Sequence, residues 1–273
     1  MVTHRPLEPR FEVQILAGQR GVLMGKKLGV VILAAGYGKR LGGENQKVIK
    51  EILGKPMLLY LMETVKKLSP EEIILVVGFR KEEVIKQLEG ERVKFVEQPV
   101  PLGTGDAVRK TEPLLKNFNG DILILYGDVP FISYRTLKNF IEDFRESNTD
   151  VSIITVCFEN PTGYGRIIRN EKKEITGIIE EVNATPEQKK IKEVNSGICI
   201  FKKDVLFETL KEVKKDPVKN EYYLTDVVKI LASKNKKIHS YTTDIPEEVM
   251  GINTIEEIKR AEKFLKEKKW IVV

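Results

Sequence analysis

The sequence contains few of the residues that most often build metal centres, disulfide scaffolds or membrane anchors. Only two of its 273 residues are histidines, His4 and His239, which are too few and too scattered for a histidine-based metal or catalytic site. Its two cysteines, Cys157 and Cys199, lie in apolar strand-like runs, where we expect buried, reduced thiols. No apolar run approaches membrane-spanning length and no apolar signal core begins the chain, so we expect a cytoplasmic protein.

Neither sign of charge dominates the chain. The 46 basic and 40 acidic residues are interspersed and give a net charge of +6. A nucleic-acid-binding stripe would need clustered positive charge, so we expect neither a nucleic-acid nor a membrane partner. The mild positive excess suits small anionic substrates, and 41% hydrophobic residues suffice for a real core.

From residue 28 onward, apolar runs alternate with helical patterns. We expect strands at 28–34, 73–77, 93–97, 121–126 and 151–157, and helices at 56–68, 81–88, 103–118 and 133–146. Near-continuous apolar strands joined by helices predict an α/β fold, a Rossmann-like and mostly parallel sheet with helices on both faces. Ligands of such sheets bind beyond the carboxyl ends of the strands.

The remaining segments differ from this pattern. Residues 151–253 predict a small β-rich half with a hairpin at 165–180, and residues 254–273 predict a C-terminal helix. Residues 1–27 show no periodicity, so we expect a flexible extension. Because Met24 is a natural start, we expect residues 1–23 to derive from an upstream start codon or an expression vector.

A glycine-rich, cationic turn follows the first apolar run. Val30–Ala35 leads into Gly36-Tyr37-Gly38-Lys39-Arg40, and Lys47 comes seven residues later. Glycines let backbone N–H groups approach an anion, and the two cations would add charge there. The turn has neither the Gly-Lys-Ser/Thr ending of a P-loop nor the third glycine of the dinucleotide fingerprint. It therefore predicts a phosphate-binding loop of another design.

Two more motifs follow strands of the first half. The Gln98 amide carries the donors and the acceptor that a base edge requires, and Gly103-Thr104 begins a helix whose N–H groups can hold a nucleoside. A simple N-cap explains Thr104 equally well. Asp128, after Tyr126-Gly127, suits a magnesium ion shared with phosphate, or else caps the next helix.

Polar residues beside glycine mark the strand ends of the second half. Gly165, Glu180 and Asn195 suit sugar hydroxyls, although each alone is also explained as a turn or solvated residue. The Asn253 carbonyl would be a second cation ligand, or the residue merely caps the helix at Thr254.

Taken in order, these segments resemble the sugar nucleotidyltransferases. The order is Leu-Ala-Ala-Gly-x-Gly-x-Arg, a lysine, Gln before Leu-Gly-Thr-Gly, Gly-Asp-x-Pro, Gly-Tyr-Gly-Arg-Ile, Glu-Glu, Asn-Ser-Gly-Ile, Glu-Tyr-Tyr-Leu-Thr-Asp and Gly-Ile-Asn. Over about residues 28–255 they are most similar to the uridyltransferase domain of the bifunctional enzyme that makes UDP-N-acetylglucosamine. The resemblance implies the nucleotide-diphospho-sugar transferase fold, with a nucleotide half at about 28–150 and a sugar-binding half at about 151–253.

The resemblance also implies residue roles. Nucleotide contacts fall on Leu33, Ala34, Ala35 and Gly36, and the uracil contacts on Gln98, Gly103 and Thr104. The catalytic cations are Arg40 at the pyrophosphate and Lys47 at the phosphates. Sugar contacts fall on Tyr126, Gly165, Glu180 and Asn195, and the magnesium ligands are Asp128 and Asn253.

Three residues depart from the pattern of that family. Lys39 replaces a threonine, Gln46 replaces a proline before the lysine, and Asp106 replaces a histidine after Gly-Thr-Gly. No hexapeptide repeat of a β-helical acetyltransferase domain occurs in the sequence. We therefore expect neither acetyl transfer nor the trimer that this domain builds, and the oligomeric state stays open.

The implied reaction is the transfer of UMP from UTP to N-acetyl-α-D-glucosamine 1-phosphate, assisted by Mg²⁺, with pyrophosphate as the second product. One alternative is a transferase for another sugar 1-phosphate, such as glucose 1-phosphate with UTP or dTTP. Another is a nucleotide-sugar-binding protein without turnover. The missing third glycine argues against a dinucleotide-dependent dehydrogenase.

Overall fold

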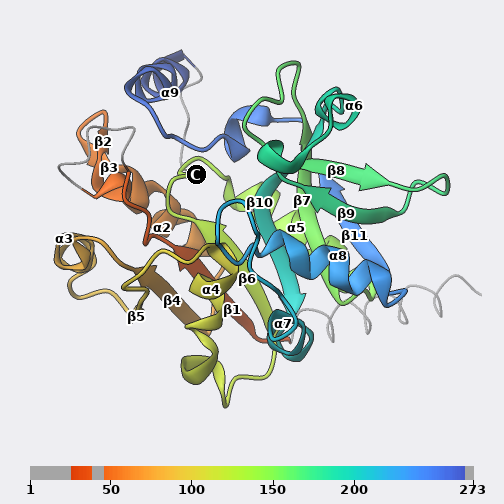
Figure 1. Cartoon of the computed structure of the whole chain (residues 1–273). Helices are drawn as coiled ribbons and strands as arrows, with labels where there is room; N and C mark the ends of the chain where they lie inside the picture. The colour runs from red at the N-terminus through yellow and green to blue at the C-terminus, as the bar shows by residue number, and fades with distance from the viewer. Residues whose placement is uncertain (1–25, 39–45, 268–273) are drawn as a thin grey trace, which may run out of the picture.

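A mixed β-sheet with helices on both faces organises the chain (Figure 1). The computed structural model describes residues 26–38 and 46–267, so most of the predicted extension at 1–27 lies outside the described residues. Within these residues the sheet has nine strands, and its main path runs β11-β7-β10-β6-β1-β4-β5. The strands of this path are β1 (Leu28–Leu33), β4 (Glu72–Val77), β5 (Lys94–Glu97), β6 (Asp121–Tyr126), β7 (Val151–Cys157), β10 (Glu193–Lys202) and β11 (Ile238–Thr242).

The central strands are buried on both faces, as their apolar runs predict. In β1, Val30 and Ile32 pack into one core while Val31 packs into the other, since successive side chains alternate across a sheet. Parallel pairing of β1 with both β4 and β6 aligns this alternation across three strands. The predicted α/β class is therefore confirmed.

Each face of the sheet carries its own helices. One core includes residues of α2 (Met57–Lys67), α3 (Lys81–Gln87) and α5 (Tyr134–Ser147). The other includes residues of α4 (Thr104–Arg109), α7 (Lys203–Leu210) and α8 (Thr225–Ser233). The predicted N-cap of α5 is confirmed, because the Ser133 hydroxyl accepts a hydrogen bond from Thr136 N at 3.1 Å.

β10 runs antiparallel to both of its main neighbours, β6 and β7. It begins at Glu193 opposite Cys157, so its first residues lie at the carboxyl end of β7. The hairpin of β8 (Arg166–Arg169) and β9 (Ile175–Ile179) pairs with it. The strands of both predicted halves thus belong to one sheet.

Several short elements and one longer C-terminal helix, α9 (Ile255–Glu267), complete the described part of the chain. The short elements are η2 (Lys47–Ile49), β2 (Glu51–Ile52), β3 (Lys55–Pro56), η4 (Glu181–Asn183), α6 (Pro186–Lys189) and η5 (Pro246–Val249). The helix expected at 103–118 is wrong as one element, because α4 ends at Arg109 and a 3-10 turn, η3 (Glu112–Leu115), follows. Pro113 explains the break, since proline has no N–H for the helical ladder and disfavours helix in the residue before it.

The two thiols differ in burial. Cys199 is buried in β10, and burial raises the pKa of its thiol above the usual range. Cys157 is exposed, so the prediction of burial is wrong for this residue. It is the last residue of β7, and the six residues before it in the strand are all buried.

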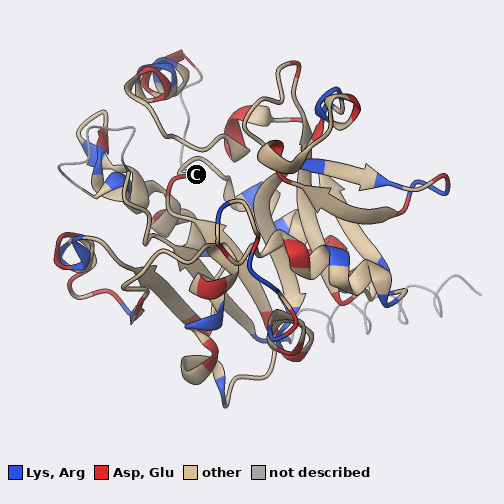
Figure 2. Ribbon diagram, in the orientation of Figure 1, with Lys and Arg blue, Asp and Glu red and all other residues tan. Residues whose placement is uncertain are grey.

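Charged residues lie mainly on helices and loops, with both signs on both sides of the molecule (Figure 2). The interspersed charge of the sequence therefore persists in three dimensions. Among the described residues, no helix combines the length and the apolar composition that crossing a membrane requires.

Candidate active site

The predicted nucleotide residues gather at the carboxyl edge of the parallel strands. The backbone of Ala34 donates to Val76 O at 2.9 Å, and Gly127 N donates to Leu33 O at 2.9 Å. A Cβ on Gly78 would lie 2.9 Å from the carbonyl oxygens of both Ala35 and Gln98. The loops after β1, β4, β5 and β6 therefore pack closely, which requires glycine at position 78.

Lys47 joins the two predicted magnesium ligands. Its ammonium forms an ion pair with the Asp128 carboxylate and donates to Asn253 Oδ1 at 2.5 Å. Both contacts are largely shielded, because the Lys47 side chain is 11% exposed and that of Asp128 is 24% exposed. The structure thus brings Lys47, Asp128 and Asn253 to one point.

The chain around Asn253 is held in place by backbone and capping contacts. Ile252 N donates to Asp128 O at 2.8 Å, which fixes this loop on the end of β6. Thr254 caps α9 by accepting from Glu257 N at 3.2 Å, and the Glu257 carboxylate accepts from the N–H groups of Asn253 and Thr254. Because Thr254 is the cap, the side chain of Asn253 remains available to a cation.

Asp128 and Asn253 fit a magnesium ion. Their oxygens already converge on one cationic nitrogen, and Mg²⁺ prefers oxygen ligands. Within the described residues, no group of three or more His, Cys, Asp or Glu side chains forms a metal cage. The two residues suit a site at which phosphates and water complete the coordination.

Gln46 supports the loop after β1, a role that sequence reasoning missed. Its fully buried side chain donates to Ala34 O at 2.8 Å and Gly36 O at 3.0 Å, and accepts from Val48 N at 3.2 Å. By occupying these carbonyls it fixes the backbone of the predicted phosphate loop. The only sign of this role in the sequence was that Gln46 stands where the family pattern has a proline.

Arg40, the second predicted catalytic cation, lies outside the described residues together with Lys39. Of the two predicted catalytic cations, Lys47 is therefore the one whose position the structure gives.

The predicted base-recognition residues form a compact group. Gln98 is 5% exposed, and its Nε2 donates to Gly103 O at 3.0 Å and to the Asp106 carboxylate at 2.8 Å. The Thr104 hydroxyl accepts from Leu224 N at 3.0 Å and hydrogen-bonds with Tyr126. Thr104 thereby connects α4 with the predicted sugar residues.

The four predicted sugar residues also lie together. Asn195 N donates to Gly165 O at 2.8 Å, and a Cβ on Gly165 would lie 3.5 Å from the Glu180 carboxylate. A Cβ on Gly197 would lie 2.8 Å from the Tyr126 ring, so the glycine of the Asn-Ser-Gly motif makes room for this ring.

Burial raises the pKa values of two of these side chains, Glu180 and Tyr126. Desolvation raises the pKa of the Glu180 carboxyl, which accepts a 2.9 Å hydrogen bond from the Thr225 hydroxyl. Desolvation likewise raises the pKa of Tyr126 far above its usual range. Tyr126 is therefore a neutral hydrogen-bonding group, and ionising Glu180 costs free energy.

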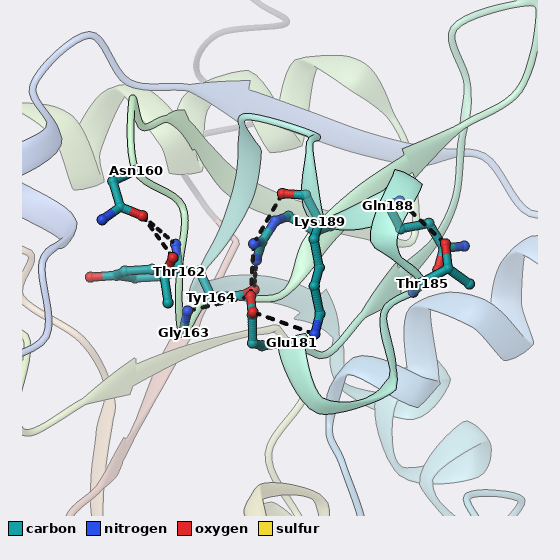
Figure 3. A network of polar contacts seen from close by, with 9 residues as sticks. Asn160, Thr162, Gly163, Tyr164, Glu181, Thr185, Gln188 and Lys189 are labelled. Atoms are coloured by element: carbon teal, nitrogen blue, oxygen red, sulfur yellow. Dashed lines mark hydrogen bonds and ion pairs between the residues drawn. The ribbon is translucent and has the colours of Figure 1, made fainter.

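Arg166 organises the loop beside Gly165, and sequence reasoning assigned it no role of its own. It is 1% exposed, its Nη2 lies 2.7 Å from the Glu181 carboxylate, and Nη1 donates to Tyr164 O. Figure 3 shows Glu181 between Gly163 and Lys189, and Gly163 N donates to Glu181 Oε2 at 3.4 Å. The Tyr164 hydroxyl reaches the Gly251 backbone, which ties this loop to the segment that carries Asn253.

The architecture is that of the nucleotide-diphospho-sugar transferase fold. One structure from Bacillus anthracis, described as a glucose-1-phosphate thymidylyltransferase, matches with a TM-score of 0.70 at 19% identity, over 88% of this chain and 96% of that one. A UDP-glucose pyrophosphorylase complexed with UDP-glucose matches with a TM-score of 0.70 at 22% identity, over 89% and 99% of the two chains. At such identities the likeness establishes the fold.

The chain belongs to the Nucleotidyl transferase family, whose model matches residues 29–270. The Bifunctional protein GlmU of Caldicellulosiruptor saccharolyticus is 43% identical over 89% of this chain and 53% of its own length. GlmU of Thermosipho africanus is 42% identical over 87% of this chain and 50% of its own length. The chain thus spans about half the length of the curated relatives it matches, and the predicted family resemblance is confirmed.

Proposed function

We propose that this chain transfers a uridylyl group from UTP to N-acetyl-α-D-glucosamine 1-phosphate and releases pyrophosphate. The observation that carries the proposal is the convergence of Lys47, Asp128 and Asn253 just beyond the carboxyl end of β6. The similarity to GlmU proteins supports the choice of substrates.

The chemistry needs positioning and charge neutralisation more than proton transfer. A phosphate oxygen of the sugar phosphate attacks the α-phosphorus of UTP, and the bond to the pyrophosphate group breaks. Because the attacking oxygen is already anionic, no general base is required. The main barrier is the repulsion between two polyanions, which preorganised cations and dipoles reduce.

The residues divide this work. Gln98 and the start of α4 hold the base, while Glu180 and Asn195 hydrogen-bond to sugar hydroxyls. Lys47 and Arg40 stabilise charge on the phosphates and the leaving pyrophosphate. Asp128 and Asn253 would hold Mg²⁺, which supplies further neutralisation of phosphate charge when bound.

The proposal is tested by measuring pyrophosphate release over a matrix of nucleoside triphosphates and sugar 1-phosphates with Mg²⁺. UTP with N-acetylglucosamine 1-phosphate is expected to give the highest kcat/KM. A higher value with glucose 1-phosphate, or with dTTP, would assign the chain to another sugar nucleotidyltransferase. Release with no pair, despite nucleotide-sugar binding, would identify a binding protein.

Asp128→Ala tests the proposed metal ligand. Loss of one contact to the reacting phosphates is expected to lower turnover about 100-fold, or roughly 3 kcal/mol of barrier. The matched control is Asp204→Ala, whose side chain is 75% exposed on α7 and which should retain turnover. A folded Asp128→Ala enzyme with normal Mg²⁺-dependent turnover would contradict the assignment.

A further inference from the structure

Asp106 is a buried carboxylate beside the side chain proposed to recognise the base. It lies in the first turn of α4, is 6% exposed, and its Oδ2 accepts from Gln98 Nε2 at 2.8 Å. The same nitrogen donates to the Gly103 carbonyl at 3.0 Å. Both N–H groups of the Gln98 amide are therefore directed at protein acceptors.

The chemistry of these partners determines which end of the amide is free. A carbonyl oxygen and an ionised carboxylate accept hydrogen bonds and cannot donate them. Turning the amide over would place Gln98 Oε1 against two acceptors, which is costly at a buried position. Within the described part of the chain no donor contacts Oε1, so this oxygen is the group available to a ligand.

We propose that Asp106 is a specificity-determining residue that selects nucleobases carrying a ring N–H donor. By holding the Gln98 amide in one orientation, it presents an acceptor to the base. The imide N–H of uracil or thymine can donate to that acceptor, whereas the unprotonated ring nitrogen of cytosine would face it as a second acceptor. This inference rests on the proposed function and explains a choice among pyrimidines at that same site.

Asp106→Asn is the direct test. An asparagine amide can donate to Gln98 Oε1, so only the Gly103 carbonyl still opposes the flipped amide. A fraction of the Gln98 side chains can then turn over and present the N–H₂ group to the base. The ratio of kcat/KM for UTP over CTP is expected to be at least about 100-fold in the unmodified protein and to fall at least about tenfold in the variant. Calorimetric binding of UDP and CDP provides the same ratio without turnover.

Lys110→Ala is the matched control. The Lys110 ammonium lies 3.9 Å from the other oxygen of Asp106 and does not contact Gln98. Its removal should leave the UTP/CTP ratio unchanged. A folded Asp106→Asn protein with an undiminished UTP preference would overturn the proposal.

A measurement on the unmodified protein covers the case in which Asp106→Asn fails to fold. Replacing UTP by 3-methyl-UTP removes the ring N–H, and we expect binding to weaken at least about 100-fold. The analogue 5-methyl-UTP carries the same methyl group on carbon, keeps the N–H, and should bind within a few-fold of UTP. Equal binding of the two methylated analogues would refute the proposal.

These outcomes separate the inference from the proposed function. Turnover with UTP and an unchanged ratio in Asp106→Asn would refute only the role of Asp106. Discrimination in binding without pyrophosphate release would refute only the transferase activity. No binding of any uridine nucleotide would refute both.

Discussion

Lys47 shows how one cation can serve two purposes in this site. Its ammonium contacts both Asp128 and Asn253, the oxygens that would hold Mg²⁺. An ammonium group and a divalent ion cannot share that position, because like charges at contact distance repel strongly where water is excluded. Binding of a metal at these oxygens would therefore require Lys47 to move, and the phosphates of the proposed nucleotide would be the natural new partner for its charge.

Lys47→Met is accordingly expected to have opposite effects on two ligands. Without nucleotide, Mn²⁺ should bind about tenfold more tightly because the competing ammonium is gone, a change of about 1.4 kcal/mol. The affinity for UTP should fall at least about tenfold, since a charge-assisted phosphate contact is lost. Calorimetry measures both affinities, with Lys50→Met as a control in the same segment. Weaker Mn²⁺ binding in Lys47→Met would show that the lysine supports the metal site instead of competing for it.

At the scale of elements, the start of α4 depends on its attachment to the segment before α8. Gly105 N donates to Tyr222 O at 2.8 Å, and Tyr222 N donates to Leu102 O at 2.7 Å. Gly103 has φ of +97° and ψ of 173°, a conformation that is essentially restricted to glycine. A Cβ there would lie 2.5 Å from Tyr222 O, so no side chain fits.

Gly103→Ala is therefore expected to destabilise the protein more than backbone strain alone explains. Gly90 is the matched control, because its φ is +83° and a Cβ would meet nothing within 4 Å. Gly90→Ala should cost about 1 kcal/mol of unfolding free energy, and Gly103→Ala at least about 2 kcal/mol more. Denaturant unfolding measures the difference. Equal losses would mean that crowding of the added Cβ against Tyr222 costs nothing beyond the backbone strain.

The loop before β8 is the second element whose position one buried side chain controls. Arg166 connects the Tyr164 carbonyl, the Glu181 carboxylate and, at 3.4 Å, the Lys189 carbonyl. A lysine cannot reproduce these contacts, since it offers a single point charge in place of a planar fork. The loop that carries Gly165 would then be free to shift relative to Glu180.

Arg166→Lys should consequently raise the KM for the sugar phosphate about tenfold while changing kcat and the KM for UTP less than about threefold. Arg169→Lys is the control on the same strand, because Arg169 pairs with Glu193 at the surface with 30% of its side chain exposed. Steady-state kinetics with each substrate varied separately makes the comparison. A uniform loss of kcat without any change in KM would contradict a positioning role.

At the scale of the whole molecule, two acidic side chains, Glu180 of the predicted sugar residues and Asp226, lie in a region that is partly shielded from water. Desolvation raises the pKa values of both Glu180 and Asp226, and the charge on Asp226 raises that of Glu180 further. In the folded state Glu180 therefore holds its proton to higher pH than in the unfolded chain. Its contribution to stability is fully present below the unfolded pKa and is lost as pH rises through the raised folded value.

Glu180→Gln should remove this dependence. At low pH the variant and the parent protein are expected to have similar free energies of unfolding, and the variant should become relatively more stable as pH rises above about 4.3, the ordinary glutamate pKa. Denaturant unfolding over a pH series measures the difference, with Glu159→Gln as an exposed control. A constant difference across the series would contradict the raised pKa of Glu180.

Much of the architecture followed from local patterns in the chain. Short apolar runs and the alternation of side chains along a strand depend only on neighbouring residues, so the order of strands and helices could be predicted. The Ser133 cap of α5 is a local signal of the same kind. The broken helix at Pro113 was missed although the proline itself is a local signal. The antiparallel course of β10 was not predicted, because strand direction depends on distant partners.

The sequence by itself determined the alternating α/β pattern and the residue types available for phosphate, base and sugar. Only the tertiary structure placed Lys47 on Asp128 and Asn253, which are 81 and 206 residues away along the chain. It alone showed that Gln46 holds the loop after β1 and that Asp106 accepts a hydrogen bond from Gln98. The physical reason is that composition and periodicity act along the chain, whereas hydrogen bonds and charge pairs act through space, and folding decides which groups meet.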